Sequence, residues 1–129
     1  MNRILIVDDS LIVRRQVASV LLGANLNVVE AGDGLDAIAK LKLHRDVALV
    51  VCDVSMPRMG GIEFLETLRV SSLQVDVIML TTEADPELMA QAKRLGARGW
   101  LTKPVQPDLL LRLARHVLAL KASPAARPG

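Results

Sequence analysis

The feature that most constrains the fold is an apolar run that ends on a carboxylate, Val-Ala-Leu-Val-Val-Cys-Asp at residues 47–53. Six consecutive apolar residues without a polar break predict a strand buried on both faces, as at the centre of a parallel sheet. In open parallel α/β sheets, ligands bind outside the carboxyl ends of the strands. Asp53 is therefore expected where such folds carry out their chemistry.

Apolar runs alternate with helical patterns along the whole chain. The runs expected as strands cover residues 3–7, 26–30, 47–53, 75–80 and 99–102. Helices are expected to begin near residues 10, 33, 62, 86 and 107. In the first of them Ser10 is the expected cap and Gly23 the stop, and the inner face is expected to hold Leu11, Val17, Val20 and Leu21. Asp33 and Asp85 are interpreted as caps of later helices.

This alternation predicts a doubly wound parallel sheet with helices on both faces. Because crossovers between parallel strands are right-handed, we expect a flavodoxin-like (βα)5 fold with strand order 2-1-3-4-5. At 129 residues the chain is expected to be a single α/β domain. We expect the folded domain to span residues 1–122, with a flexible tail at 123–129.

Composition excludes several classes of function. No apolar run approaches the roughly 20 residues of a membrane helix, and the first residues do not resemble a signal peptide. We therefore expect a soluble, cytoplasmic protein without a membrane partner. The 16 basic and 14 acidic residues are spread along the chain, and Trp100 and Phe64 are the only aromatic residues. Direct binding of nucleic acid is not expected from this pattern.

The predicted strand order brings together Asp8, Asp9 and Asp53 at the carboxyl ends of neighbouring strands. Three adjacent carboxylates repel one another, and a divalent cation such as Mg²⁺, which prefers oxygen ligands, resolves the conflict. Lys103 and Thr81, at the ends of the fifth and fourth strands, add an ammonium and a hydroxyl group. Together these groups predict a site for a phosphoryl group.

Asp53 is the preferred phosphoryl acceptor among the three carboxylates. It alone ends the central strand, and it precedes the loop Val-Ser-Met-Pro-Arg-Met-Gly-Gly, whose proline and glycines are expected to prevent regular structure. Carboxylates are known to accept phosphoryl groups. The hypothesis from the residues is therefore an aspartyl phosphate at Asp53.

These motifs resemble those of the receiver domain of two-component response regulators, the CheY-like family. The resemblance covers about residues 2–121. The matching positions are Asp8-Asp9, Asp53, Met56-Pro57, Gly60-Gly61, Thr81 and Lys103-Pro104. The family shares the predicted strand order, so the topology rests on this analogy as well. The resemblance implies a signalling domain that supports its own phosphotransfer and slow dephosphorylation but is not an enzyme.

The resemblance also implies a role for each matching residue. Asp53 would accept the phosphoryl group from a sensor histidine kinase or a phosphotransfer protein. Asp9, Asp53 and the carbonyl of Ser55 would ligate Mg²⁺ directly, and Asp8 would act largely through water. Lys103, before an expected cis proline, would pair with the phosphate, and Thr81 would move toward it.

Other positions of the family concern the output of the switch. Trp100 occupies the position of the switch aromatic, which is commonly Tyr or Phe. Ser55 and Glu83 resemble the positions that tune hydrolysis of the aspartyl phosphate. Phosphorylation would change the face formed by the fourth helix, fifth strand and fifth helix. That face would bind a downstream protein, with the chain acting as a monomer or as a phosphorylation-dependent dimer.

Several alternatives stay open from the sequence. The chain is expected to act as a single-domain regulator, but it could be the receiver half of a longer regulator with a DNA-binding or enzymatic output domain, or a scaffold independent of phosphorylation. A haloacid-dehalogenase-like phosphatase is disfavoured, because such an enzyme would carry a second aspartate at the position of Ser55. A flavodoxin-like cofactor carrier is disfavoured because Asp8-Asp9-Ser10 would repel a flavin phosphate.

Overall fold

Five parallel strands form the sheet of this protein, in the order β2-β1-β3-β4-β5. The computed structural model describes residues 3–82 and 85–122. Within them the strands are β1 (Arg3–Val7), β2 (Asn27–Ala31), β3 (Val47–Asp53), β4 (Asp76–Thr81) and β5 (Gly99–Thr102). The predicted strand order is confirmed, and β3 lies at the centre of the sheet with all its residues buried.

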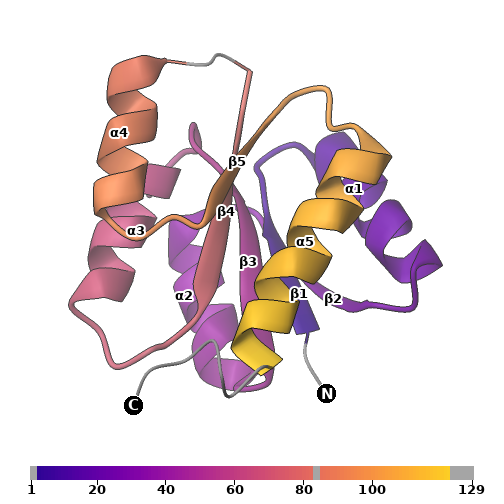
Figure 1. The fold of residues 1–129 in the computed structure, drawn as a ribbon. Coiled ribbons are helices and arrows are strands. Elements are labelled where there is room, and N and C mark those ends of the chain that lie inside the picture. The colour runs from indigo at the N-terminus through magenta and orange to yellow at the C-terminus, as the bar shows by residue number, and fades with distance from the viewer. Residues whose placement is uncertain (1–2, 83–84, 123–129) are drawn as a thin grey trace.

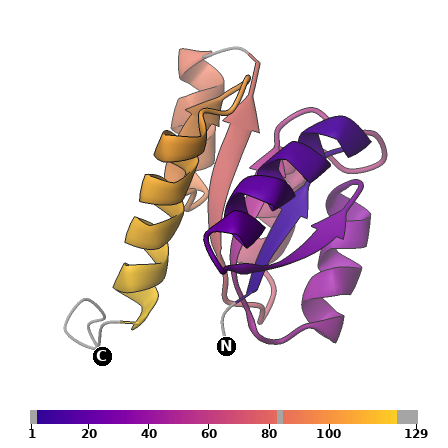
Figure 2. The same cartoon turned by 90° about the vertical axis from the view of Figure 1, so that its right-hand side faces the viewer.

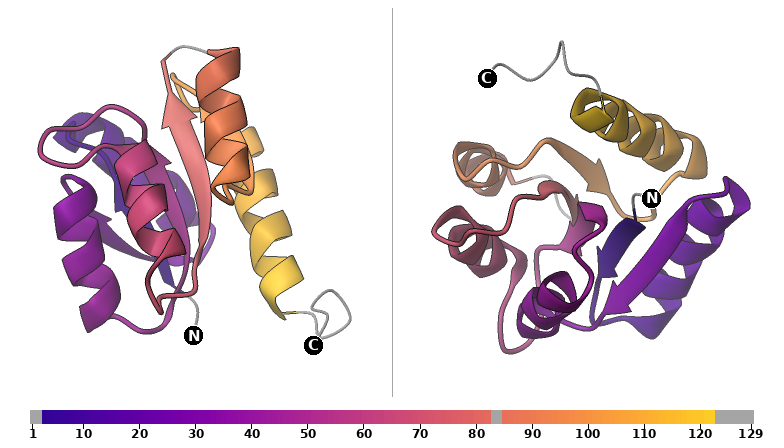
Figure 3. Two further views of the ribbon diagram at one scale, coloured as in Figure 1. Left: turned by 90° about the vertical axis from the view of Figure 1, so that its left-hand side faces the viewer. Right: turned by 90° about the horizontal axis from the view of Figure 1, so that it is seen from below.

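The helices alternate with the strands and cover both faces of the sheet (Figure 1). They are α1 (Leu11–Gly23), α2 (Gly34–Leu43), α3 (Gly61–Arg69), α4 (Pro86–Arg94) and α5 (Pro107–Ala122). Helices α1 and α5 lie on one face (Figure 2), and α2, α3 and α4 lie on the other (Figure 3). The predicted flavodoxin-like α/β fold is therefore confirmed.

Alternating side chains of the strands supply two separate cores. Ile4 and Ile6 of β1 pack with α1 and α5, whereas Leu5 and Val7 of the same strand pack with α2, α3 and α4. This alternation follows from the period of two residues along a strand. No helix in residues 3–82 and 85–122 has the length and apolar character that crossing a bilayer requires.

The caps expected at Ser10, Asp33 and Asp85 are confirmed. Each side chain accepts a hydrogen bond from a backbone N–H in the first turn of the helix that follows it. These contacts satisfy donors that a helix start leaves without an intrahelical partner. These capped starts follow β1, β2 and β4, whereas α3, which follows β3, begins after Gly60 without a side-chain cap.

One prediction about α1 was confirmed and one was wrong. The helix ends at Gly23, the expected stop, and the left-handed conformation follows at Asn25 (φ 63°), a residue type that tolerates it. Leu11 was expected on the inner face, but it is 54% exposed. It lies in the first turn of α1, and the buried residues of this helix begin at Val17.

Candidate functional site

Three carboxylates meet at the carboxyl ends of β1 and β3, as predicted. Val7 pairs with Cys52 in the parallel register, which places Asp8 and Asp9 beside Asp53. Each of the three residues offers an oxygen, and these oxygens lie within 4.8 Å of one another. Asp8 and Asp53 are buried, whereas Asp9 is exposed. The site therefore holds a dense negative charge with one side open to solvent.

Lys103 brings a cation to this cluster from the end of β5. Its Nζ atom lies 2.7 Å from Asp8 Oδ2 and 3.3 Å from Asp53 Oδ1. Its backbone N–H donates to the carbonyl of Thr81 (2.7 Å), and its peptide bond to Pro104 is cis, as expected. The fifth strand therefore places the predicted ammonium group between the two buried carboxylates.

Burial and neighbouring charges raise the pKa values of both Asp53 and Lys103. Burial raises the pKa of Asp53, and the negative charge of Asp8 raises it further, against the opposing effect of Lys103. Burial works against the charge of Lys103, but its contacts with Asp8 and Asp53 prevail and raise the pKa of the ammonium. One ammonium thus does not fully compensate three carboxylates.

A hard divalent cation fits this donor set. Asp8 Oδ2 is buried and lies 2.7 Å from the ammonium of Lys103, which also pairs with Asp53. Mg²⁺ binds carboxylate and carbonyl oxygens, and it keeps several waters that the exposed side of Asp9 can accommodate. The residues present therefore suit the cation that the sequence predicts.

The backbone around Asp8 is fixed by neighbouring residues. The N–H of Ser10 donates to Asp8 Oδ1 (2.9 Å), and Arg14 Nη1 donates to the Asp8 carbonyl (2.7 Å). Arg14 in turn pairs with Glu30 (3.2 Å). Sequence reasoning missed Arg14, because an isolated arginine in a helix carries no pattern that links it to a backbone carbonyl six residues earlier.

The loop after β3 lies close to the backbone of Asp53. A Cβ atom on Gly61 would lie 2.5 Å from the Asp53 carbonyl oxygen, and one on Gly60 would lie 3.0 Å from that of Val54. The expectation that both glycines prevent regular structure was wrong for Gly61, which is the first residue of α3. Its missing side chain instead lets α3 begin directly against the end of β3.

Thr81 and Ser55 border a second part of the site. Together with Asp53 they line a pocket of about 310 Å³ between the loop after β3 and the start of α4. Thr81 is buried, and Ser55 is exposed. The structure therefore gathers all six predicted site residues at one edge of the sheet. Glu83 lies outside the described residues.

Trp100, the predicted switch aromatic, lies on β5 next to this edge. It pairs with Met79 of β4 and packs against the core beneath α2, α3 and α4. Its indole Nε1 is buried, and within residues 3–82 and 85–122 it has no hydrogen-bond acceptor. A buried donor without an acceptor costs free energy. A rearrangement of β5 that gave the indole N–H an acceptor would remove this cost.

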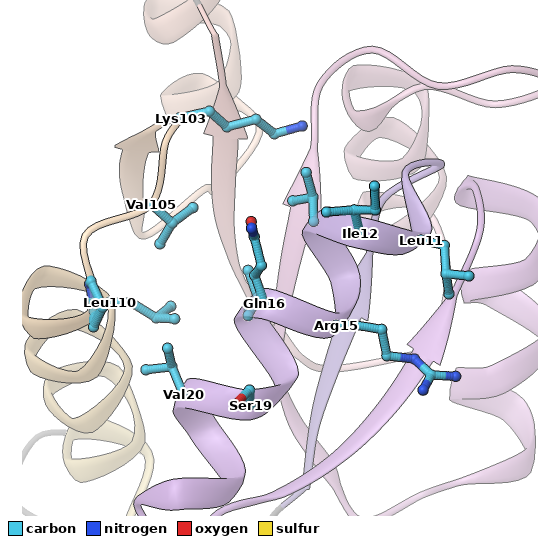
Figure 4. Close-up of a pocket in the computed structure, with 12 residues that line it drawn as sticks. Leu11, Ile12, Arg15, Gln16, Ser19, Val20, Lys103, Val105 and Leu110 are labelled. Atoms are coloured by element: carbon cyan, nitrogen blue, oxygen red, sulfur yellow. The ribbon is translucent and has the colours of Figure 1, made fainter.

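An apolar groove of about 780 Å³ continues from the site between α1 and the start of α5 (Figure 4). Lys103 lies at one end of the groove, and Val105, Pro107 and Leu110 line the side formed by α5. Leu11 and Ile12 lie at the start of α1, and Ile12 is 71% exposed. Sequence reasoning missed this surface because Leu11 was expected inside the core.

Known proteins with the same arrangement were found by sequence and by structure. Residues 4–115 match the family described as the response regulator receiver domain. The transcriptional regulatory protein UhpA of Escherichia coli (strain K12) is 40% identical over 121 residues, which are 92% of this chain and 59% of that protein.

Two chemotaxis proteins are similar over almost their full length. The chemotaxis protein CheY of Bacillus subtilis (strain 168) is 33% identical over 118 residues, which are 91% of this chain and 98% of that protein. A solved structure of the chemotaxis protein CheY4 of Vibrio cholerae has a TM-score of 0.84 and 39% identity, over 91% of this chain and 98% of that chain. The similarity extends to both the sequence and the fold.

Proposed function

The chain belongs to the response regulator receiver domain family, and on this premise we propose that it is a phosphorylation switch with Asp53 as acceptor. The donor would be the phosphohistidine of a sensor histidine kinase or of a phosphotransfer protein. The observation that carries this proposal is the position of Lys103 between the buried carboxylates of Asp8 and Asp53. This arrangement concentrates groups suited to phosphoryl transfer around one acceptor.

In the proposed reaction a carboxylate oxygen of Asp53 attacks the phosphorus atom, and the bond from phosphorus to the donor histidine breaks. The acceptor must be ionised to attack. Lys103 favours the ionised form of Asp53, and its ammonium is positioned to pair with a phosphoryl oxygen. The hydroxyl of Thr81 supplies a hydrogen-bond donor at the same edge.

We propose that Asp8, Asp9, Asp53 and the carbonyl of Ser55 hold Mg²⁺. The ion would supply the positive charge that neutralises the carboxylates and the incoming phosphoryl oxygens. Asp8 would act largely through water. The buried carboxylate of Asp8, which shares one ammonium with Asp53, supports this assignment.

The chain would act as a signalling domain and not as an enzyme with a separate substrate. The aspartyl phosphate would hydrolyse slowly by attack of water, and Ser55 lines the pocket through which water reaches Asp53. The exposed side chain of Ser55 can therefore influence that rate. Glu83 is proposed for the same role.

The output face is proposed to comprise α4, β5 and α5. Thr81 and Lys103 are joined by a backbone hydrogen bond, so that a movement of either toward a phosphoryl group acts on β4 and β5 together. Trp100 lies on β5 and would move with this strand. If the movement brought an acceptor to its indole N–H, the new hydrogen bond would favour the rearranged state of β4 and β5. The rearranged face would bind a downstream protein.

The phosphodonor protein is proposed to cover the groove between α1 and α5. A donor histidine can reach Asp53 only if its protein contacts the surface around the site. Lys103 belongs both to the site and to this groove, so the two surfaces are continuous. The exposed apolar side chains of Leu11 and Ile12 are suited to be buried by such a contact.

We propose a cytoplasmic regulator that contacts neither membrane nor nucleic acid through this chain, with residues 1–122 as the receiver unit. It would act as a monomer or as a phosphorylation-dependent dimer. The full-length similarity to chemotaxis proteins supports a single-domain regulator. The match to 59% of a longer transcriptional regulator supports the alternative of a receiver within a longer protein.

Backbone amide NMR spectra in saturating Mg²⁺, compared before and after addition of acetyl phosphate, test this proposal. We expect amide shifts near Asp53 and also across α4, β5 and α5, and we expect neither set in Asp53→Asn. If the amides near Asp53 do not shift, the acceptor role is refuted. If they shift while the face of α4, β5 and α5 does not, the proposed output face is refuted.

A further inference from the structure

We infer that Asp33 and Arg58 form an ion pair that positions the metal-binding loop, defined as residues 54–60. This inference rests on the Mg²⁺ site proposed above, because the loop carries the Ser55 carbonyl. Neither residue was assigned to the site from the sequence. Asp33 was interpreted only as a helix cap, and Arg58 received no role.

The carboxylate of Asp33 makes two contacts with its two oxygens. Oδ1 accepts the backbone N–H of Asp36 (2.9 Å) and thereby caps α2. Oδ2 accepts from Arg58, with distances of 2.7 Å to Nε and 2.6 Å to Nη2. The Asp33 side chain is buried, whereas that of Arg58 is 61% exposed. The start of α2 thus presents a fixed acceptor to the loop.

Two further contacts seat the same part of the loop on α2. The N–H of Gly34 donates to the carbonyl of Met59 (3.0 Å). The side chain of Met59 lies against Gly34 so closely that a Cβ atom there would be 2.5 Å from Met59 Cγ. The ion pair, the hydrogen bond and this packing therefore act at one point of the loop.

The ends of the metal-binding loop are anchored separately. The N–H of Val54 donates to Leu80 (3.1 Å), and the N–H of Gly61 donates to the Val54 carbonyl (2.8 Å). Ser55 lies between these anchors and the contacts with α2. Its carbonyl position consequently depends on both.

The backbone of Arg58 shows that the loop needs an external constraint. Arg58 has φ 63°, a left-handed conformation that is unfavourable for residues with an ordinary side chain. Its guanidinium can reach Asp33 from this conformation. Loss of the ion pair would therefore release the loop toward other backbone conformations and weaken the preorganisation of the Ser55 carbonyl.

Positioning and simple electrostatics predict different results. If charge alone mattered, removing the negative charge of Asp33 would weaken Mg²⁺ binding, and removing the positive charge of Arg58 would strengthen it. If the pair positions the loop, both substitutions weaken binding. Asparagine suits both tests, because it can still cap α2 at position 33 and tolerates φ 63° at position 58.

The experiment measures Mg²⁺ affinity by calorimetry for wild type, Asp33→Asn, Arg58→Asn and the double variant. Amide hydrogen exchange of residues 55–61 is measured on the same proteins without metal. Arg3→Asn is the matched control, since it breaks an exposed ion pair with Asp46 at the start of β1, and the metal site lies at the other end of that strand.

We expect each single variant to bind Mg²⁺ about tenfold more weakly, as for other residues that orient metal ligands, and to exchange its loop amides faster. The double variant should be no weaker than either single variant, and the control should match wild type. Stronger binding by Arg58→Asn, or unchanged affinity and exchange in both variants, would overturn the inference. Failure of wild type to bind Mg²⁺ would instead refute the proposed metal site.

Discussion

Lys103 makes its shorter ion pair with Asp8 and not with Asp53, at 2.7 Å against 3.3 Å from its Nζ atom. The fully buried carboxylate of Asp8 thus holds the ammonium in the unphosphorylated protein, and the acceptor carboxylate is only its second partner. The resemblance to receiver domains implied a pairing of Lys103 with the phosphate. A phosphoryl group on Asp53 would therefore compete with Asp8 for this cation.

Replacement of Lys103 by methionine should destabilise the protein without metal. The substitution leaves buried Asp8 without its cation, and loss of one partner of a buried ion pair costs about 3 kcal/mol. Urea denaturation at pH 7 measures this difference. Mg²⁺ should recover part of the lost stability, since it supplies positive charge to the same carboxylates. Equal stability of the two proteins without metal would contradict the assigned role of Lys103.

Replacement of Asp53 by asparagine should stabilise the protein at pH 7 without metal, by about 1 kcal/mol. The pKa of Asp53 is raised above its ordinary value of 3.8, so the folded protein binds this proton more tightly than the unfolded chain does. Stability contributed by Asp53 therefore falls as the pH rises from about 3.8 through the raised pKa, and it stays low above that pKa.

The measurement for Asp53→Asn is urea denaturation at several pH values. The advantage of the variant should shrink as the pH falls toward 4, where Asp53 in the wild type gains its proton. Mg²⁺ should also remove the advantage, because it stabilises the wild type more. A variant that is less stable than wild type at pH 7 without metal would show that the carboxylate is not under electrostatic strain.

Replacement of Gly61 by alanine should destabilise the protein by about 2 kcal/mol, in the range found for overpacking. The added Cβ atom would lie 2.5 Å from the Asp53 carbonyl oxygen and 2.7 Å from Met79 Cε. Gly23→Ala is the matched control, because a Cβ atom at Gly23 meets nothing within 4 Å and alanine favours the helix. If thermal denaturation shows the same change for both variants, the close approach of α3 to β3 is not important for stability.

Replacement of Ile12 by aspartate should slow phosphotransfer from a histidine kinase by about tenfold, which corresponds to about 1.4 kcal/mol. Ile12 is 71% exposed, so the substitution should leave the fold intact. Phosphorylation by acetyl phosphate should be unchanged, because this small donor does not need the groove.

Leu43→Asp is the control for this prediction. Leu43 is 73% exposed at the end of α2, and α2 lies on the opposite face of the sheet from the groove. Its substitution should leave the rates of phosphorylation by the kinase and by acetyl phosphate unchanged. Equal rates of kinase transfer in Ile12→Asp and wild type would exclude the groove between α1 and α5 as the docking surface.

The topology could be predicted because its signals are local. The run at residues 47–53 is interpreted as a buried strand, and each Asp or Lys of the site either ends a strand or lies within two residues after one. Once the strand order was known, the meeting of Asp8, Asp53 and Lys103 followed from the geometry of a parallel sheet. Resemblance to a known family supported the same residues.

The remaining contacts could not be predicted because they join residues without a shared pattern. Arg58 lies in an irregular loop and meets Asp33 across 25 positions of the sequence, and Arg14 supports Asp8 through a backbone carbonyl. Leu11 fits the helical spacing of a core residue, yet it lines the groove and is 54% exposed. Such contacts depend on the angles between elements, which periodicity does not determine.

The intact mass of the protein after incubation with acetyl phosphate, with and without Mg²⁺, tests the central claim most directly. We predict one phosphoryl adduct in wild type that requires Mg²⁺ and is absent from Asp53→Asn. An adduct of the same yield in Asp53→Asn, or no adduct in folded wild-type protein with Mg²⁺ present, would contradict the assignment of Asp53 as the acceptor in a magnesium-dependent switch.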